Sequence, residues 1–170
     1  DADRRDLPMT TTEQTLALRE LVAPGTVGML VSATPGGELH SRPLTLAEVG
    51  DHGSLWFIVD DRADWVGGLA AGGTVNFAVA DGSDGDWVSI AGSGELRDDA
   101  AKLDRLWSPF ASAYFEEGEE SEHARLLEVK PHSAEYWDAP SSRVARLANA
   151  ALGLVGKRPP MGDSGTLELD

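Results

Sequence analysis

The chain has 170 residues, a hydrophobic content of 41% and a formal net charge of -15, which suits one globular domain and disfavours binding to nucleic acid or an anionic membrane. It contains no cysteine, so disulfides, thiolate metal sites and a cysteine nucleophile are excluded. No segment has the ~20 consecutive apolar residues of a membrane span, and we expect a cytoplasmic protein.

The first third of the chain is expected to form a helix and then antiparallel strands. Leucine and valine residues among polar ones predict a helix over Thr10–Val22, which Pro24 and Gly25 end. Runs rich in apolar and β-branched residues predict strands over Thr26–Thr34, Glu38–Val49 and Ser54–Val59. The first two are separated by Pro35-Gly36-Gly37 and should pair as a hairpin. The third is apolar enough to be expected buried on both faces.

The rest of the chain alternates short helices with further strands. Strands are predicted over Val75–Ala80, Trp87–Leu96 and Leu126–Trp137, with a hairpin loop at 81–85. Helices are predicted over Arg62–Ala71, Asp98–Trp107 and 141–155. Asp98 and Asp99 favour the N-terminus of the helix over Asp98–Trp107, and Ser141 or Ser142 can cap the helix over 141–155.

This order of elements predicts a mainly β (α+β) domain, built as a small antiparallel barrel with peripheral helices. The alternating β and α units of a doubly wound sheet do not occur in the pattern. Neither an internal repeat nor a long linker divides the chain. We therefore expect an N-terminal tail over residues 1–9 and a single domain over residues 10–170, which includes the C-terminal helix 141–155 and the tail after it.

The residue pattern offers no catalytic or metal-binding constellation. The histidines lack the i, i+4 spacing of a helical metal pair. Ser93 lies within a predicted strand rather than at the strand-to-helix turn of a hydrolase nucleophile. We expect no metal site and no catalytic side chain, so any chemistry must come from a bound cofactor.

Several short motifs follow one another in a fixed order: His40-Ser41-Arg42-Pro43-Leu44, Leu55-Trp56-Phe57, Trp87-Val88-Ser89-Ile90-Ala91-Gly92, Leu106-Trp107-Ser108-Pro109, Tyr114-Phe115 and Ala134-Glu135-Tyr136-Trp137-Asp138. In order and spacing, over roughly Thr10–Leu169, they resemble the bacterial general stress proteins related to pyridoxamine 5'-phosphate oxidase. The resemblance implies a six-stranded split β-barrel of Greek-key topology with a final short strand at Thr166–Leu169. It also implies a homodimer that holds one FMN in each of two clefts at the subunit interface.

The resemblance assigns FMN binding to a set of residues: Arg42, Pro43, Leu44, Ile58, Val59, Arg62, Ala63, Trp65, Trp87 and Trp137. Arg42 matches the arginine that holds the flavin phosphate, a role suited to its fixed fork of donors. The backbone of Pro43 and Leu44 would run along the flavin ring. Trp137 matches an aromatic residue from the partner subunit, and Trp87 lies where relatives contact the flavin edge.

The phosphate end of this pattern departs from the family. Val59, Ala63 and Trp65 stand where the family has Thr, Ser and Lys. Acidic residues bracket the stretch: Asp60, Asp61 and Asp64. A carboxylate ~5 Å from a phosphate, at an effective dielectric constant of about 20, would repel it by roughly 3 kcal/mol. Arg62 is the cation that could swing in to replace the missing lysine.

Simpler roles are open to the same residues. Arg42 could pair with a carboxylate on a neighbouring strand, and Trp137 could equally belong to a dimer core. Trp87 is predicted to pack in the barrel core. Trp65 could fill the space vacated by lysine as a hydrophobic plug, or it could occupy the phosphate pocket itself.

Two functions follow from these alternatives. The first is a flavin-dependent oxidoreductase in which the protein supplies binding and orientation. The second is a non-enzymatic split-barrel dimer whose flavin phosphate site is degenerate and which binds another ligand or none. A deazaflavin-dependent reductase and true pyridoxamine-phosphate oxidation are disfavoured, because each needs further cations for a phosphate-bearing group.

Overall fold

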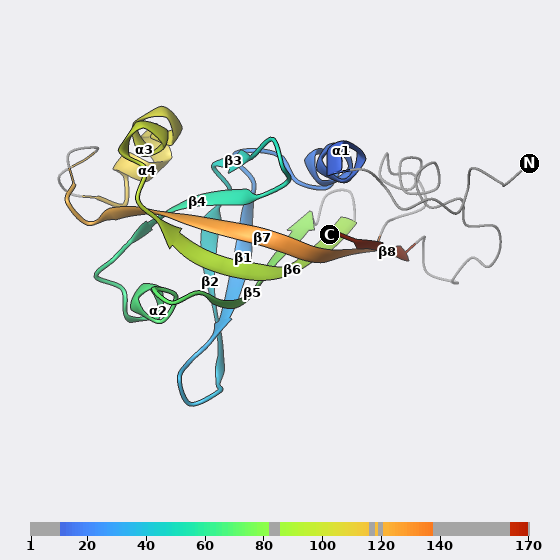
Figure 1. The fold of residues 1–170 in the computed structure, drawn as a ribbon, viewed down its shortest axis with the longest axis horizontal. Helices are drawn as coiled ribbons and strands as arrows, with labels where there is room; N and C mark the ends of the chain where they lie inside the picture. Colours follow the sequence, from blue (N-terminus) through green and yellow to red (C-terminus); the bar gives the residue numbers. More distant parts are fainter. Residues whose placement is uncertain (1–10, 82–85, 116–117, 119–120, 138–163, 170) are drawn as a thin grey trace, which may run out of the picture.

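The structure is a computed structural model that describes residues 11–81, 86–115, 118, 121–137 and 164–169 (Figure 1). The predicted N-terminal tail (1–9) and C-terminal helix (141–155) lie outside the described residues. The helices are α1 (Thr11–Leu21), α2 (Asp64–Gly67), α3 (Ala100–Leu106) and α4 (Pro109–Ser112). The strands are β1 (Val27–Ala33), β2 (Leu39–Thr45), β3 (Glu48–Val49), β4 (Leu55–Asp60), β5 (Gly73–Asp81), β6 (Asp86–Arg97), β7 (Ala124–Trp137) and β8 (Ser164–Glu168). Within these ranges, no helix is long and apolar enough to cross a membrane.

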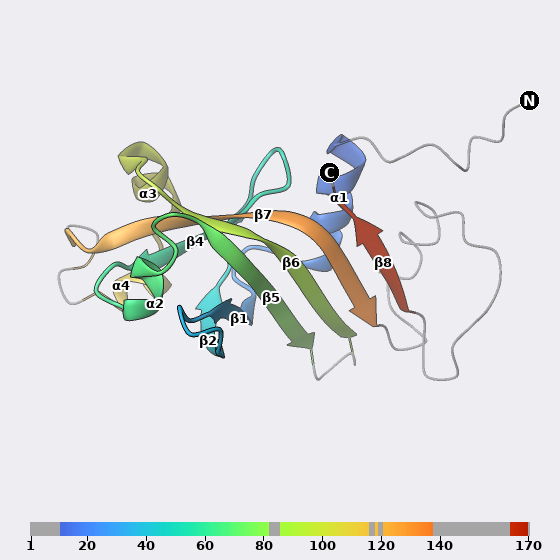
Figure 2. The ribbon, with the colours of Figure 1, turned by 60° about the horizontal axis from the view of Figure 1, so that its bottom comes forward.

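The strands form one antiparallel sheet that curls into a split barrel. Their order is β2-β1-β5-β6-β7-β4-β3, and β8 pairs with β7 outside this path. The β1–β2 hairpin crosses the long strands β6 and β7 in Figure 1, and Figure 2 shows the arrangement from a second direction. The predicted mainly β split barrel is thus confirmed. Its six predicted strands correspond to β1, β2, β4, β5, β6 and β7.

Alternate side chains of the strands fill the barrel. Leu30, Phe57 and Phe77 are 0% exposed, and the rings of Phe57 and Phe77 meet edge to face with their centroids 4.9 Å apart. Along β4, however, fully buried residues alternate with half-buried ones. The prediction that this strand is buried on both faces is therefore wrong, because the face that carries Trp56 and Ile58 stays partly open.

The predicted strand Glu38–Val49 is in fact two strands with a corner between them. β2 pairs with β1, but at the corner the Leu46 N–H donates to the Thr26 carbonyl (2.8 Å) and the Ala47 N–H donates to the Trp56 carbonyl on β4 (2.8 Å). The chain changes partner here, and β3 continues along β4. Leu46 is 0% exposed, so its burial anchors the corner. The corner joins β2 to β4 at one end and leaves them unpaired beyond it in the described sheet.

The helix predicted over Arg62–Ala71 is also shorter than expected. α2 has four residues, and the turns after it are held by hydrogen bonds between residues three apart, such as that from the Leu69 N–H to the Val66 carbonyl (2.9 Å). Glycines at 67 and 68 disfavour a longer helix. α3 confirms the helix predicted over Asp98–Trp107. Asp99 caps α3 by accepting a hydrogen bond from the Lys102 N–H (2.9 Å). α4 is not among the predicted elements.

α3 is fixed to the barrel by a charged cluster. Glu48 on β3 accepts hydrogen bonds from Lys102 Nζ (2.8 Å) and Arg105 Nη1 (2.6 Å). Lys102 Nζ also lies 4.0 Å from the ring centroid of Trp56 on β4. The hydrogen bond from Arg105 holds the pKa of Glu48 below its ordinary value. This cluster covers Trp56 on β4 and fixes α3, which precedes a segment that borders the cavity.

A second charged group lies in the middle of the sheet. Glu128 on β7 is 9% exposed and accepts hydrogen bonds from Ser54 Oγ (2.8 Å) and Arg97 Nε (2.7 Å). Burial raises the pKa of Glu128, but the hydrogen bonds from Ser54 and Arg97 outweigh that effect and leave the pKa below its ordinary value. Both carboxylate oxygens are therefore partnered where three strands meet.

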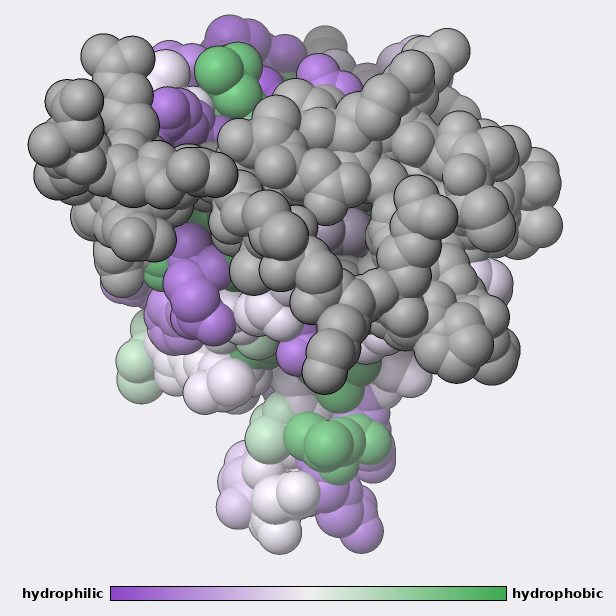
Figure 3. All heavy atoms as spheres, turned by 90° about the vertical axis from the view of Figure 1, so that its right-hand side faces the viewer, coloured by the Kyte–Doolittle hydropathy of each residue, from purple (hydrophilic) through white to green (hydrophobic). Residues whose placement is uncertain are grey.

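The tip of the β1–β2 hairpin projects from the body of the molecule. In Figure 3 it forms the protrusion at the bottom of the view and carries hydrophobic surface. Leu39, at the start of β2, is 73% exposed. The hairpin therefore has one end in the barrel and one end in solvent.

Candidate functional site

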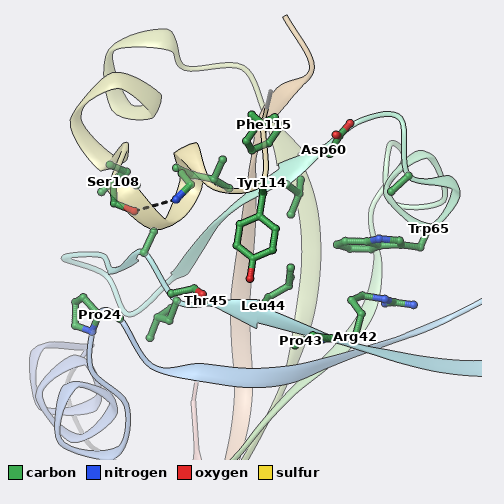
Figure 4. A pocket seen from close by; sticks show the side chains of 18 residues that line it. Pro24, Arg42, Pro43, Leu44, Thr45, Asp60, Trp65, Ser108, Tyr114 and Phe115 are labelled. Atoms are coloured by element: carbon green, nitrogen blue, oxygen red, sulfur yellow. Dashed lines mark hydrogen bonds between the residues drawn. The ribbon is translucent and has the colours of Figure 1, made fainter. Parts of the chain in front are cut away.

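A cavity of about 610 Å³ lies in the split between β2 and β4 (Figure 4). α2 borders it on one side, and the segment that contains α4 borders it on the other. Seven of the ten residues predicted to bind the cofactor line this cavity: Arg42, Pro43, Leu44, Ile58, Val59, Ala63 and Trp65. The structure therefore brings together residues that are far apart in the sequence, on both sides of the split.

The free edge of β2 forms one wall of the cavity. β2 is the first strand of the described sheet and pairs with β1 on one side. Because the backbone of Leu46 bonds toward β1, strand alternation turns the backbone groups of Pro43 and Thr45 away from β1. Pro43 has no N–H to leave unpaired, which suits an edge position. Its carbonyl and the backbone N–H and carbonyl of Thr45 are thus placed to meet a ligand.

The opposite wall contains residues that were not predicted individually. They come from the end of α3, from α4 and from the residues on either side of α4, and they are Leu106, Ser108, Ala111, Tyr114 and Phe115. The Tyr114 ring reaches into the middle of the cavity in Figure 4, although the residue as a whole is 73% exposed. The signal that could have identified all of them except Ala111 is their place in the motifs Leu106-Trp107-Ser108-Pro109 and Tyr114-Phe115.

Arg42 lies at one end of the cavity and already has partners. Its Nη1 donates a hydrogen bond to Ser32 Oγ (2.8 Å), and Ser32 is 5% exposed. Its Cζ lies 4.5 Å from the ring centroid of Trp65. Burial lowers the pKa of Arg42. No carboxylate among the described residues is within ion-pair distance of Arg42. The structure therefore does not show the alternative in which Arg42 pairs with a carboxylate on a neighbouring strand.

Trp65 covers the Arg42 guanidinium, as Figure 4 shows. The indole is half-buried and packs against the hydrophobic core. It therefore fills space at the wall and lies on the cation at the same time. A cation on an indole face is attracted by the ring's quadrupole, by about 0.5–2 kcal/mol depending on exposure.

Arg62 does not line the cavity, in contrast to its predicted role as a replacement cation. It forms a bidentate ion pair with Asp60, in which Nε lies 2.9 Å from Oδ1 and Nη2 lies 2.7 Å from Oδ2. The same Oδ1 accepts the Arg62 backbone N–H (2.9 Å). These hydrogen bonds hold the pKa of Asp60 below its ordinary value. Asp60 itself lines the cavity.

Trp87 and Trp137 lie apart from this cavity within one chain. They face each other across β6 and β7 and are 49% and 45% exposed, so the prediction that Trp87 packs in the barrel core is wrong. Together with Val27, Met29 and Val79 they line a shallow second cavity of about 420 Å³. The exposed side chains here, Val27, Met29, Trp87 and Trp137, define an apolar face on the outside of the barrel, whereas Val79 packs against the core.

Comparison with known proteins agrees with this architecture. Residues 13–160 match the family model described as pyridoxamine 5'-phosphate oxidase like. A candidate general stress protein 26 from Jannaschia sp. CCS1 is 28% identical, with 93% of this chain and 97% of that chain covered and a TM-score of 0.65. The general stress FMN/FAD binding protein of Xanthomonas citri is 27% identical, with 90% and 100% covered and a TM-score of 0.61.

A more distant relative shares only the fold with this chain. A heme binding protein from Mycobacterium smegmatis is 18% identical, with 76% of this chain and 55% of that chain covered and a TM-score of 0.53. No curated protein matches the sequence. The family match over most of the length, the split barrel and the similarity to general stress proteins agree with one another. The chain belongs to the pyridoxamine 5'-phosphate oxidase like family.

Proposed function

We propose that this protein binds a flavin in the cavity between β2 and β4 and works as a flavin-dependent oxidoreductase. The observation that carries the proposal is the composition of the cavity walls. An isoalloxazine ring is flat and largely apolar, with carbonyl and N–H groups at one end. Its apolar part suits walls formed by Leu44, Ile58 and Val59, and its polar end suits the free backbone edge at Pro43 and Thr45.

FMN is the flavin expected from the family resemblance, and the Xanthomonas citri relative is an FMN/FAD binding protein. A bound flavin would supply the electron transfer, and the chain would bind and orient its ring. Arg42 and Trp65 would border one end of the ligand, while Tyr114 would limit access of water from the other wall. Nothing in this proposal requires an acid or base from the chain.

We further propose that the protein is a homodimer that associates through the apolar face. This face exposes two indoles and two aliphatic side chains on neighbouring strands: Val27, Met29, Trp87 and Trp137. A cluster of exposed aromatic side chains of this kind is typical of protein interfaces rather than of free surface. A second copy of the chain is the partner that the family resemblance implies.

A non-enzymatic dimer is the second candidate function. The contact between Trp65 and Arg42 favours it, because the indole covers one face of the guanidinium and narrows the approach of a phosphate to its edge. Flavin binding separates the two candidates, since the non-enzymatic alternative needs no flavin.

Absorbance and titration test flavin binding directly. The purified protein should be yellow or should quench flavin fluorescence with a dissociation constant in the micromolar range, about -8 kcal/mol. Ile58→Trp, which places an indole in the cavity, should weaken binding at least about tenfold. Leu39→Trp adds the same indole at the exposed hairpin and should leave binding unchanged. A colourless protein with no binding near millimolar flavin would refute the proposal.

A further inference from the structure

The end of the cavity near Trp65 carries no excess of positive charge. Arg42 and Asp60 are the only charged residues among those that line the cavity in the described structure, and their charges are opposite. A phosphate monoester carries about two negative charges at neutral pH. It is held where several cations or unused backbone N–H groups converge. The charge balance alone therefore does not favour a phosphate here.

Arg42 is engaged before any ligand arrives. Its guanidinium donates to the buried hydroxyl of Ser32 (2.8 Å), and one of its faces is covered by the Trp65 indole (4.5 Å). A phosphate could approach the guanidinium only along its edge, where the N–H donors lie, because the indole covers one face and Nη1 is already bonded to Ser32. Figure 4 shows the indole lying directly over the guanidinium.

The turn after β4 already contains its own anion. The Asp60 carboxylate accepts the Arg62 backbone N–H (2.9 Å) and two guanidinium nitrogens of Arg62, which are the kinds of donor that hold a phosphate. Neighbouring N–H groups are also used: Asp61 donates to the His123 carbonyl (3.0 Å) and Ala63 donates to the Asp60 carbonyl (3.1 Å). An internal carboxylate thus already uses the donors of this turn that could otherwise bind an anion.

We propose that this cavity binds the flavin ring without using a terminal phosphate, so that riboflavin and FMN bind with similar affinity. The inference rests on the proposed function and makes it more specific. Trp65 and Asp60 are its specificity-determining residues, since the first covers the cation and the second replaces the anion. The ring and the ribityl chain supply the binding, and the phosphate remains in solvent.

The test is a pair of fluorescence titrations of the full chain, one with riboflavin and one with FMN. We expect the two dissociation constants to agree within about fivefold, because a phosphate that makes no charge-assisted hydrogen bonds adds little affinity. If wild-type protein binds FMN about fiftyfold or more tightly than riboflavin, the inference is wrong while flavin binding stands. If neither flavin binds, the proposed function fails and this inference fails with it.

Substitutions at Trp65 test whether its indole sets the relative affinity for FMN and riboflavin. Trp65→Lys should shift the preference toward FMN by about tenfold, because an ammonium then faces the phosphate. Trp65→Gln removes the same indole without adding charge and should shift it by less than about threefold. Leu16→Lys adds the same charge on α1, at a position that is 54% exposed and outside the cavity, and should leave the preference unchanged.

Asp60→Asn is an independent test of the same preference, and it changes no residue of the hydrophobic core. Without the internal carboxylate, Arg62 and the N–H groups of the turn are available to a ligand anion. The affinity for FMN relative to riboflavin should therefore rise by about fivefold or more. If the FMN preference stays at the wild-type value in both Trp65→Lys and Asp60→Asn, these residues do not determine specificity. That result would overturn the inference even where wild-type protein binds both flavins equally.

Discussion

Glu128 shows how a single buried acid shapes this protein's response to pH. Its carboxylate is shielded from water and held by Ser54 and Arg97, and its pKa in the folded chain is below the ordinary value. In the unfolded chain the pKa of a glutamate is about 4.3. The stabilisation that Glu128 contributes is therefore complete above that pH and is lost as the pH falls through the lower folded-state pKa.

Glu128→Gln is expected to lower the free energy of unfolding at pH 7 by about 1–3 kcal/mol, because Arg97 loses its buried anionic partner. The variant should also lose less stability than wild type when the pH is lowered below about 4. Urea denaturation at several pH values measures both effects. Glu95→Gln is the matched control, since Glu95 also pairs with Arg97 (2.9 Å) but has a side chain that is 49% exposed. Equal losses in the two variants would contradict the argument.

At the scale of elements, the sequence predicts the bounds of strands well where each strand keeps at least one neighbour along its whole length. α1, β1, β5, β6 and β7 begin and end within two residues of their predicted bounds. The bend after β2 could not be predicted, because Leu46 and Ala47 continue the extended pattern and only the change of partner from β1 to β4 separates two strands. Strand periodicity reports which face is buried and not which neighbour is paired.

The candidate site was predictable in part for a similar reason. Residues within the motifs on β2 and on either side of α4 lie on the cavity. The ion pair that takes Arg62 away from the cavity depends on the orientation of one side chain. The outward position of Trp87 depends on which face of β6 meets the core. Both are properties of packing, and neither follows from residue type or spacing.

Glu48→Gln is expected to loosen α3, because the helix is tied to β3 through this carboxylate. Amide hydrogen exchange in α3 should accelerate about fivefold, which corresponds to roughly 1 kcal/mol of local stability. Asp104→Asn changes an exposed acid on the same helix and should have little effect on exchange. If the two variants exchange at the same rate, the cluster does not hold the helix.

At the scale of the whole molecule, net charge and the apolar face oppose each other. A formal charge of -15 on each copy repels a second copy, while burial of Trp87 and Trp137 would favour association. The apolar face includes no charged residue, so added salt screens the repulsion without weakening the contact. We therefore expect the proposed dimer to become tighter as ionic strength rises.

Trp87→Glu is expected to weaken this dimer at least about thirtyfold, since it removes a central aromatic anchor and places a charge on the apolar face. Sedimentation velocity over a range of protein concentrations measures the change. Leu16→Glu introduces the same charge on α1, away from the apolar face, and should dissociate no more than wild type. A wild-type chain that sediments as a monomer at all concentrations would exclude the dimer.

The ion pair between Asp60 and Arg62 also bears on the state of the protein without a ligand. A ligand that binds only the folded chain stabilises it by mass action, and that stabilisation is lost when the ligand is scarce. Here the turn beside the cavity is electrostatically complete on its own. When the supply of the vitamin from which flavins are made runs short, the protein should lose only the stability that mass action gives, and this turn should stay ordered.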